Sequence, residues 1–297
     1  MRMAPGRLMV KKTETQRFDG ARYAVMTLAG SLLLSGCGIS RQILYSPNAA
    51  PAQVNWVKDQ PEAIQLSLKD GSALNGYYWP GTPGDEDIIV FFHGRNWSAA
   101  RSAEFAQYLT GVGNAVVVAS YHGFSGNPGR PSQARMMADA AAFIAFAREK
   151  AGPNARVWLI GHSIGAAVVL HAAAVDQSIE GVVAMNAFSR VAAAAPRITR
   201  ALIPDRWDNL TALKSLKHPV IFMQGGRDRI VPASSGDELF SAYGGPSSLI
   251  IGETAYHNPD MATLGPWLNT AIAAMQSGSL ATLPAPPAGW IEKVRRP

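Results

Sequence analysis

The chain alternates short apolar runs with longer stretches of helical length, and this alternation restricts the fold strongly. The runs are apolar at successive positions, which is typical of parallel strands that helices cover on both faces. They span residues 88–92, 115–120, 157–160, 182–185, 220–223 and 249–251. The stretches of helical length that separate them include residues 133–150, 165–175, 234–243 and 261–276. Alternating strands and helices predict an α/β fold with right-handed crossovers and a mostly parallel sheet.

The segments outside this alternation define the expected domain organisation. Residues 63–68 and 73–79 alternate in polarity around Lys69-Asp70-Gly71, which predicts a hairpin. We expect one domain over residues 61–277, because a chain of 297 residues that is 47% hydrophobic can bury a full core. Residues 37–60 are predicted to be a tether, and the proline-rich residues 278–297 an extended surface tail.

The positive charge of the chain lies mainly at its N-terminus. Six basic and two acidic residues precede Cys37, so +4 of the net +6 belongs to that leader. No stripe of alternating basic and aromatic residues follows, so nucleic acid is not expected as a partner.

Residues 23–36 form an uncharged, mostly apolar run of 14 residues behind the charged leader. A membrane-spanning helix needs about 18 to 20 such residues, so the run has the proportions of a secretory signal. It ends in Leu34-Ser35-Gly36-Cys37, which resembles the lipobox of bacterial lipoproteins. That resemblance implies removal of residues 1–36 and acylation of Cys37, the only cysteine. We therefore expect an envelope protein that faces the periplasm, and Gly38 favours the outer over the inner membrane. An apolar N-terminal helix with an incidental cysteine is the alternative.

The pentapeptide Gly161-His162-Ser163-Ile164-Gly165 matches the pattern G-x-S-x-G. It follows an apolar run and opens a stretch of small residues, as the strand-to-helix turn of a nucleophile elbow requires. The two glycines leave room for a tight turn and the serine can take a strained conformation. Ser163 is therefore the predicted nucleophile, and a helix-capping serine is the alternative.

A serine nucleophile needs a base, and the base needs an acid to orient it. Three histidines follow Ser163 in the sequence. His171 lies on the same predicted helix and His218 precedes a strand, whereas His257 follows the last apolar run, at the carboxyl edge of the sheet. Asp228 follows the preceding run, and the order serine, aspartate, histidine is that of α/β-hydrolases. His257 and Asp228 are the predicted base and acid, with Asp237 and Asp208 as other candidates for the acid.

Backbone amides must stabilise the oxyanion that forms during acyl transfer. The amide of Ile164, directly after the nucleophile, is one expected donor. The amide of Arg95 is the other, because Gly94 lets the chain turn after the strand at residues 88–92. His93 is predicted to fix this loop through hydrogen bonds.

Several blocks of the chain, over about residues 60 to 270, resemble the Bem46-like group of α/β-hydrolases. Besides the predicted triad they include the hairpin at Asp70-Gly71, the loop at 93–94, residues 121–126 and residues 206–210. The chain departs from that group at Arg95, where asparagine is common, and at His122, where arginine is common. The resemblance implies a serine hydrolase without metal or cofactor.

The insertion at about residues 187–217 is the expected cap over the site. Its short length predicts an open cleft. Its arginines are read either as a solvated helix face or, together with Arg95 and Arg227, as favouring an anionic substrate; they are Arg190, Arg197, Arg200 and Arg206.

The sequence as a whole predicts a lipid-anchored serine hydrolase of small ester or acyl substrates, most simply a carboxylesterase. A peptidase, thioesterase or lipase would use the same triad. A non-catalytic lipoprotein with this fold is the alternative from another class.

Overall fold

The computed structural model describes residues 41–47, 53–57, 59–111, 113–191, 203–276 and 280–296. Cys37 and cap residues 192–202, which include Arg197 and Arg200, lie outside these ranges. Within the described residues, no helix combines the length and the apolar character needed to cross a membrane.

The described strands form one sheet of mixed direction, in the order β1-β2-β4-β3-β5-β6-β7-β8-β9. The central strands from β4 to β8 are all parallel, while β1, β2 and β9 pair antiparallel at the edges. The strand bounds are β1 Glu62–Ser67, β2 Ala73–Trp79, β3 Asp87–Phe92, β4 Ala115–Val118, β5 Arg156–His162, β6 Ile179–Met185, β7 Val220–Gly225, β8 Ser247–Gly252 and β9 Trp290–Arg296. The predicted hairpin and parallel runs are therefore present.

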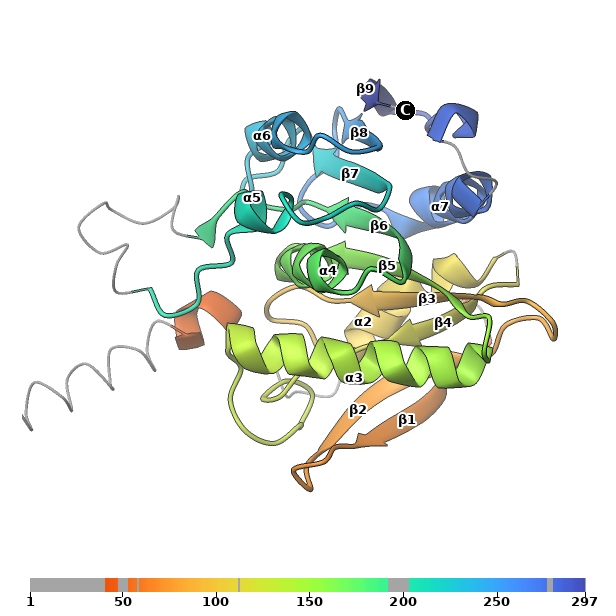
Figure 1. The fold of residues 1–297 in the computed structure, drawn as a ribbon, viewed down its shortest axis with the longest axis vertical. Helices are drawn as coiled ribbons and strands as arrows, with labels where there is room; N and C mark the ends of the chain where they lie inside the picture. The colour runs from red at the N-terminus through yellow and green to blue at the C-terminus, as the bar shows by residue number, and fades with distance from the viewer. Residues whose placement is uncertain are drawn as a thin grey trace, which may run out of the picture.

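Helices cover both faces of the sheet. One face packs against α3, α4 and α6, and the other against α2 and α7. Figure 1 shows α3 and α4 in front of the sheet and α2 behind it. The helix bounds are α2 Ala99–Ala106, α3 Gln133–Ala151, α4 Ile164–Val175, α5 Asn209–Ala212, α6 Ser234–Ala242 and α7 Met261–Gln276, with short 3-10 helices at Gln107–Thr110 and Leu280–Thr282. Strands such as β3 are buried along their whole length, which explains their continuous apolar sequence.

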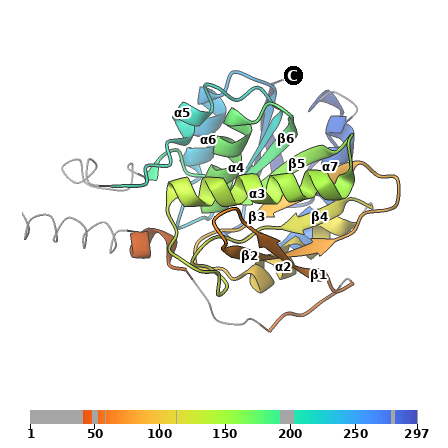
Figure 2. The same cartoon turned by 60° about the horizontal axis from the view of Figure 1, so that its bottom comes forward.

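Two segments predicted to lie outside the domain are part of it. The proline-rich tail contains β9, which pairs with β8 and covers an edge of the sheet; no proline lies within Trp290–Arg296, so the amides of the strand remain free to pair. In the predicted tether, residues 41–45 are helical and Tyr45 is fully buried. This helical segment has only five residues, which is too short for a periodic pattern of apolar residues to be recognised in the sequence. Both views place this segment beside the start of α3 (Figures 1 and 2).

Candidate active site

Ser163 occupies a sharp turn between β5 and α4. Its backbone has φ 57° and ψ −117°, a strained conformation for a residue other than glycine. A Cβ atom added to Gly161 would lie 2.2 Å from the Gly165 carbonyl oxygen, and one added to Gly165 would lie 2.0 Å from that of Phe92. Both glycines are therefore required by close backbone contacts, and the turn has the geometry predicted for a nucleophile elbow.

The structure brings His257 and Asp228 to Ser163. His257 Nε2 lies 2.9 Å from Ser163 Oγ, and His257 Nδ1 lies 2.7 Å from Asp228 Oδ2. The other carboxylate oxygen of Asp228 accepts hydrogen bonds from the amides of Ile230 and Val231, at 2.7 and 2.9 Å. Burial raises the pKa of Asp228, but the bond from His257 and the two amide bonds outweigh it and hold that pKa below its ordinary value. Asp228 is thus an ionised carboxylate aimed at His257.

The other candidates for acid and base point elsewhere. Asp237 pairs with Lys293, and Asp208 with Arg190. His171 lies along α4, 5.5 Å from the ring of Trp207, and His218 precedes β7. The histidine within hydrogen-bonding distance of the Ser163 hydroxyl is His257.

A cavity of about 350 Å³ opens beside Ser163. Its lining includes Arg95, Trp97 and Asn258 together with Ser163 and His257. Ile164 is the first residue of α4, so its amide has no partner within the helix. Gly94 lies against the nucleophile, since a Cβ placed on it would be 3.2 Å from Ser163 Cβ. Both expected oxyanion donors, Ile164 and Arg95, therefore belong to segments at the cavity.

His93 has the structural position expected for it. Its side chain is fully buried, with Nδ1 2.7 Å from the Gly94 carbonyl oxygen, and its own carbonyl accepts from Tyr121 Oη at 3.2 Å. These contacts fix the loop that carries Arg95. Among the residues that the structure describes, no group of three or more histidine, cysteine or acidic side chains is arranged to hold a metal ion.

Comparison with known proteins identifies the family. The profile described as "Serine aminopeptidase, S33" matches residues 84–207. An uncharacterized protein of Mycobacterium tuberculosis is 30% identical over 226 residues, which cover 73% of this chain and 80% of that protein. Protein bem46 of Schizosaccharomyces pombe is 24% identical over 196 residues, or 62% of this chain and 66% of that protein. This chain belongs to the Bem46-like group of α/β-hydrolases.

A solved structure supports the same fold. The Pyrococcus furiosus esterase Pf2001 superposes with a TM-score of 0.60 at 17% identity, over 78% of this chain and 97% of the esterase. The predicted α/β-hydrolase fold is therefore confirmed, and the family together with this neighbour indicates a hydrolase.

This Bem46-like protein holds the loop that carries His257 through two residues that the sequence analysis did not identify. His162 Nε2 lies 2.7 Å from the carbonyl oxygen of His257, and Asn186 Nδ2 donates to the same oxygen at 2.6 Å. A carbonyl only accepts, so Nε2 of His162 carries the proton. The His162 ring stacks on Trp97 at 5.0 Å. No local pattern signals these contacts, because 95 and 71 residues separate the partners along the chain.

Two buried neutral histidines should make the stability of the protein depend on pH. Desolvation lowers the pKa of His93 to about 4 and that of His162 to about 3. Both take up a proton on unfolding below about pH 6.5, so the free energy of unfolding falls as the pH decreases. From pH 7 to pH 5 we expect a loss of about 3 to 4 kcal/mol, measured by urea unfolding.

The variant His162→Gln provides the control for this pH effect. Its amide can still donate to the His257 carbonyl but does not titrate, so about half of the loss should disappear. An unfolding free energy that is equal at pH 7 and pH 5 in the unsubstituted protein would contradict the assignment.

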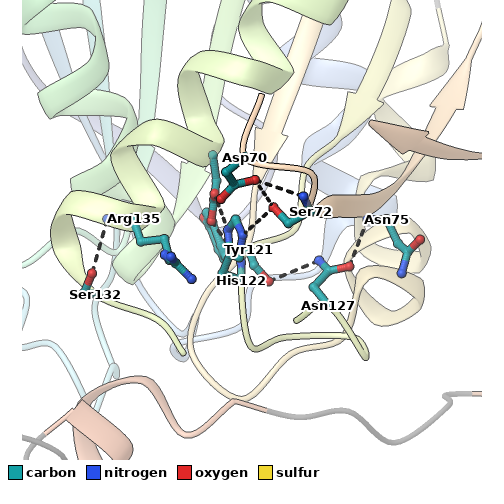
Figure 3. Close-up of polar contacts among 9 residues, drawn as sticks. Asp70, Ser72, Asn75, Tyr121, His122, Asn127, Ser132 and Arg135 are labelled. Carbon is teal, nitrogen blue, oxygen red and sulfur yellow. Dashed lines mark hydrogen bonds and ion pairs between the residues drawn. The ribbon is translucent and has the colours of Figure 1, made fainter. Parts of the chain in front are cut away.

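A second group of serine, histidine and aspartate side chains lies where the β1–β2 turn meets the segment after β4 and the start of α3 (Figure 3). Ser72 Oγ lies 3.2 Å from His122 Nε2, and His122 Nδ1 lies 2.6 Å from Asp139 Oδ1. The hydroxyl of Ser72, however, donates to Asp70 Oδ1 at 2.5 Å. Since its proton is directed to a carboxylate, His122 is not placed to remove it. The group ties the β1–β2 turn to α3, and His122 occupies the position where arginine is common in the group.

Proposed function

We propose that this protein hydrolyses carboxylic esters through an acyl-enzyme on Ser163. The observation that carries the proposal is the continuous hydrogen-bond chain from Asp228 through His257 to the Ser163 hydroxyl. It supplies a nucleophile, a base and an orienting carboxylate in the arrangement that acyl transfer needs. The esterase among the structural neighbours is consistent with this chemistry.

The reaction would proceed in two displacements. Ser163 Oγ attacks the ester carbonyl while His257 Nε2 takes the hydroxyl proton, and the amides of Ile164 and Arg95 stabilise the oxyanion. Collapse breaks the bond to the leaving oxygen, which receives that proton from His257. Water then attacks the acyl-enzyme, giving its proton to His257, and release of the acid returns the proton to Ser163. The products are one carboxylic acid and one alcohol.

Covalent labelling of the full chain in detergent tests the proposal. A fluorophosphonate probe should modify Ser163, as identified by peptide mapping, and His257→Ala should abolish the modification, because an unassisted serine hydroxyl is a weak nucleophile. Absence of labelling in well-folded protein would favour the non-catalytic lipoprotein.

A peptidase is the second candidate, because the matching family profile carries the description of a serine aminopeptidase. The same triad can cleave amides, so the two activities differ in the pocket rather than in the catalytic group. An ester and an amide of one acyl group, compared by kcat/KM on the same preparation, separate the two candidates.

We further propose that Cys37 is acylated and anchors the protein in the envelope, facing the periplasm. The signal-like run and the lipobox-like sequence before Cys37 support this proposal. Metabolic labelling with an alkynyl fatty acid should mark the protein, and Cys37→Ser should abolish the label.

A preference for anionic substrates is supported by fewer arginines in the structure than in the sequence analysis. Arg190 pairs with Asp208 at 3.0 Å, whereas Arg95 lines the cavity beside Ser163. Arg95 is therefore the described arginine best placed to meet a substrate carboxylate or phosphate. Equal kcat/KM values for neutral and anionic esters of one size would reject this preference.

A further inference from the structure

The segment that follows Cys37 packs against the loop that lines the cavity beside Ser163. Tyr45 is fully buried and its hydroxyl accepts from Trp207 Nε1 at 3.0 Å, while Arg41 pairs with Asp205 at 2.7 Å. The carbonyl of Tyr45 accepts from the amide of Asn96 at 3.2 Å. Residues 41–45 are thus fastened both to the cap side of the cleft and to the loop that carries Arg95.

This segment also forms a second hollow next to the catalytic cavity. The hollow, of about 440 Å³, is lined by Gln42, Ile43, Ser46, Pro47, Arg95 and Asn96. Arg95 and Asn96 line the catalytic cavity as well, so the two spaces meet along the same loop. Arg95 Nη2 donates to Ser46 Oγ at 3.0 Å, at the junction between them.

Ile43 is the apolar side chain exposed at this hollow. Although it belongs to a segment anchored by the buried Tyr45, its side chain is 65% exposed. Burying an aliphatic side chain of this size is favourable, so Ile43 offers an apolar contact to a molecule that enters the hollow.

The covalent chain limits how far this hollow can lie from an acylated Cys37. Arg41 is the fourth residue after Cys37, and a fully extended chain spans at most about 3.6 Å per residue. Arg41 therefore lies within about 14 Å of the anchor, and the next residue, Gln42, lines the hollow.

We propose that this hollow is a substrate subsite that receives the apolar chain of an ester carried in the membrane, next to the bond that Ser163 attacks. The proposal rests on the ester hydrolysis and the Cys37 anchor proposed above. It assigns the substrate to a class, long-chain esters presented at a lipid surface, and it gives Ile43 a role in specificity.

Two esters of one fluorescent alcohol test the proposal with the acylated protein that begins at Cys37, reconstituted in phosphatidylethanolamine and phosphatidylglycerol vesicles. One is a water-soluble butyrate and the other a palmitate held in the vesicles. Ile43→Asp should lower the ratio of kcat/KM for palmitate over butyrate by at least about tenfold, the effect expected when one aliphatic contact in a pocket is lost. Ile43→Leu should keep the ratio of the unsubstituted protein.

Val175→Asp is the matched control, because Val175 is 79% exposed at the far end of α4 and should leave both activities unchanged. A ratio that Ile43→Asp leaves unaltered, or an unsubstituted protein that cleaves butyrate but not palmitate, would overturn the subsite. Hydrolysis that persists in Ser163→Ala would instead overturn the proposed function. Thermal unfolding of each variant separates a folding defect from an effect on specificity, and Ile43→Asn, which removes the apolar contact without adding a charge, should lower the ratio in the same direction if Ile43→Asp does not fold.

Discussion

Replacing Asp228 with asparagine is expected to lower kcat by about 10⁴-fold while leaving the fold intact. The carboxylate has two differently bonded oxygens, since Oδ1 accepts from the amides of Ile230 and Val231 and Oδ2 faces His257 Nδ1. In the variant, the two amides hold the carboxamide oxygen, so its NH₂ group must face His257. It then donates to Nδ1 and shifts the imidazole proton to Nε2, which can no longer accept the proton of Ser163.

Steady-state kinetics on a soluble ester measures this loss. Asp237→Asn is the matched control, because Asp237 pairs with Lys293 on the surface and should keep kcat within about twofold. An Asp228→Asn variant with more than a tenth of the original kcat would show that another group orients His257.

The second large effect is expected for Gly165→Ala. The added Cβ would lie 2.0 Å from the Phe92 carbonyl oxygen and 2.7 Å from that of His93. Because both neighbours are backbone atoms, the end of β3 and the start of α4 must move apart. We expect a loss of more than about 3 kcal/mol in the free energy of unfolding, at the upper end of overpacking effects. We also expect a fall in kcat of at least about 100-fold, because the oxyanion loop follows Phe92 directly.

Gly244→Ala provides the comparison for this variant. Nothing lies within 4 Å of a Cβ at Gly244, and its backbone is not left-handed, so stability should change little. Thermal unfolding and kcat of the two variants measure the effects. A Gly165→Ala variant as stable and active as Gly244→Ala would mean that the elbow does not require close contact between β3 and α4.

The anchor-proximal segment shows why local patterns missed part of the fold. Residues 41–45 form one short helical turn, which is too short to show a periodic pattern of apolar residues. Tyr45 is held there by hydrogen bonds from Trp207 and Asn96, which lie far from it in the sequence. Strand β9 was missed for a related reason, because an edge strand with alternating exposure follows a proline-rich stretch. Both segments are stabilised by distant contacts rather than by their own sequence.

The amino-acid sequence by itself determined the parallel core, the turn at Ser163 and the order of the three triad residues. These features follow from local rules, since continuous apolar runs form buried strands and the two glycines around Ser163 permit a tight turn. His257 and Asp228 were found because residues that follow parallel strands meet at one edge of the sheet.

The tertiary structure alone decided which side chains hold that machinery in place. The carbonyl of His257 is bound by His162 and Asn186, and the oxyanion loop is bound by Tyr45 and Ser46. These contacts join residues 49 to 95 positions apart in the chain, and hydrogen bonds of this kind leave no periodic trace in a sequence. They form only after burial of the two faces of the sheet has brought the loops together. Local patterns therefore predict that Ser163, His257 and Asp228 meet at one edge of the sheet, but they do not predict the contacts that support these residues.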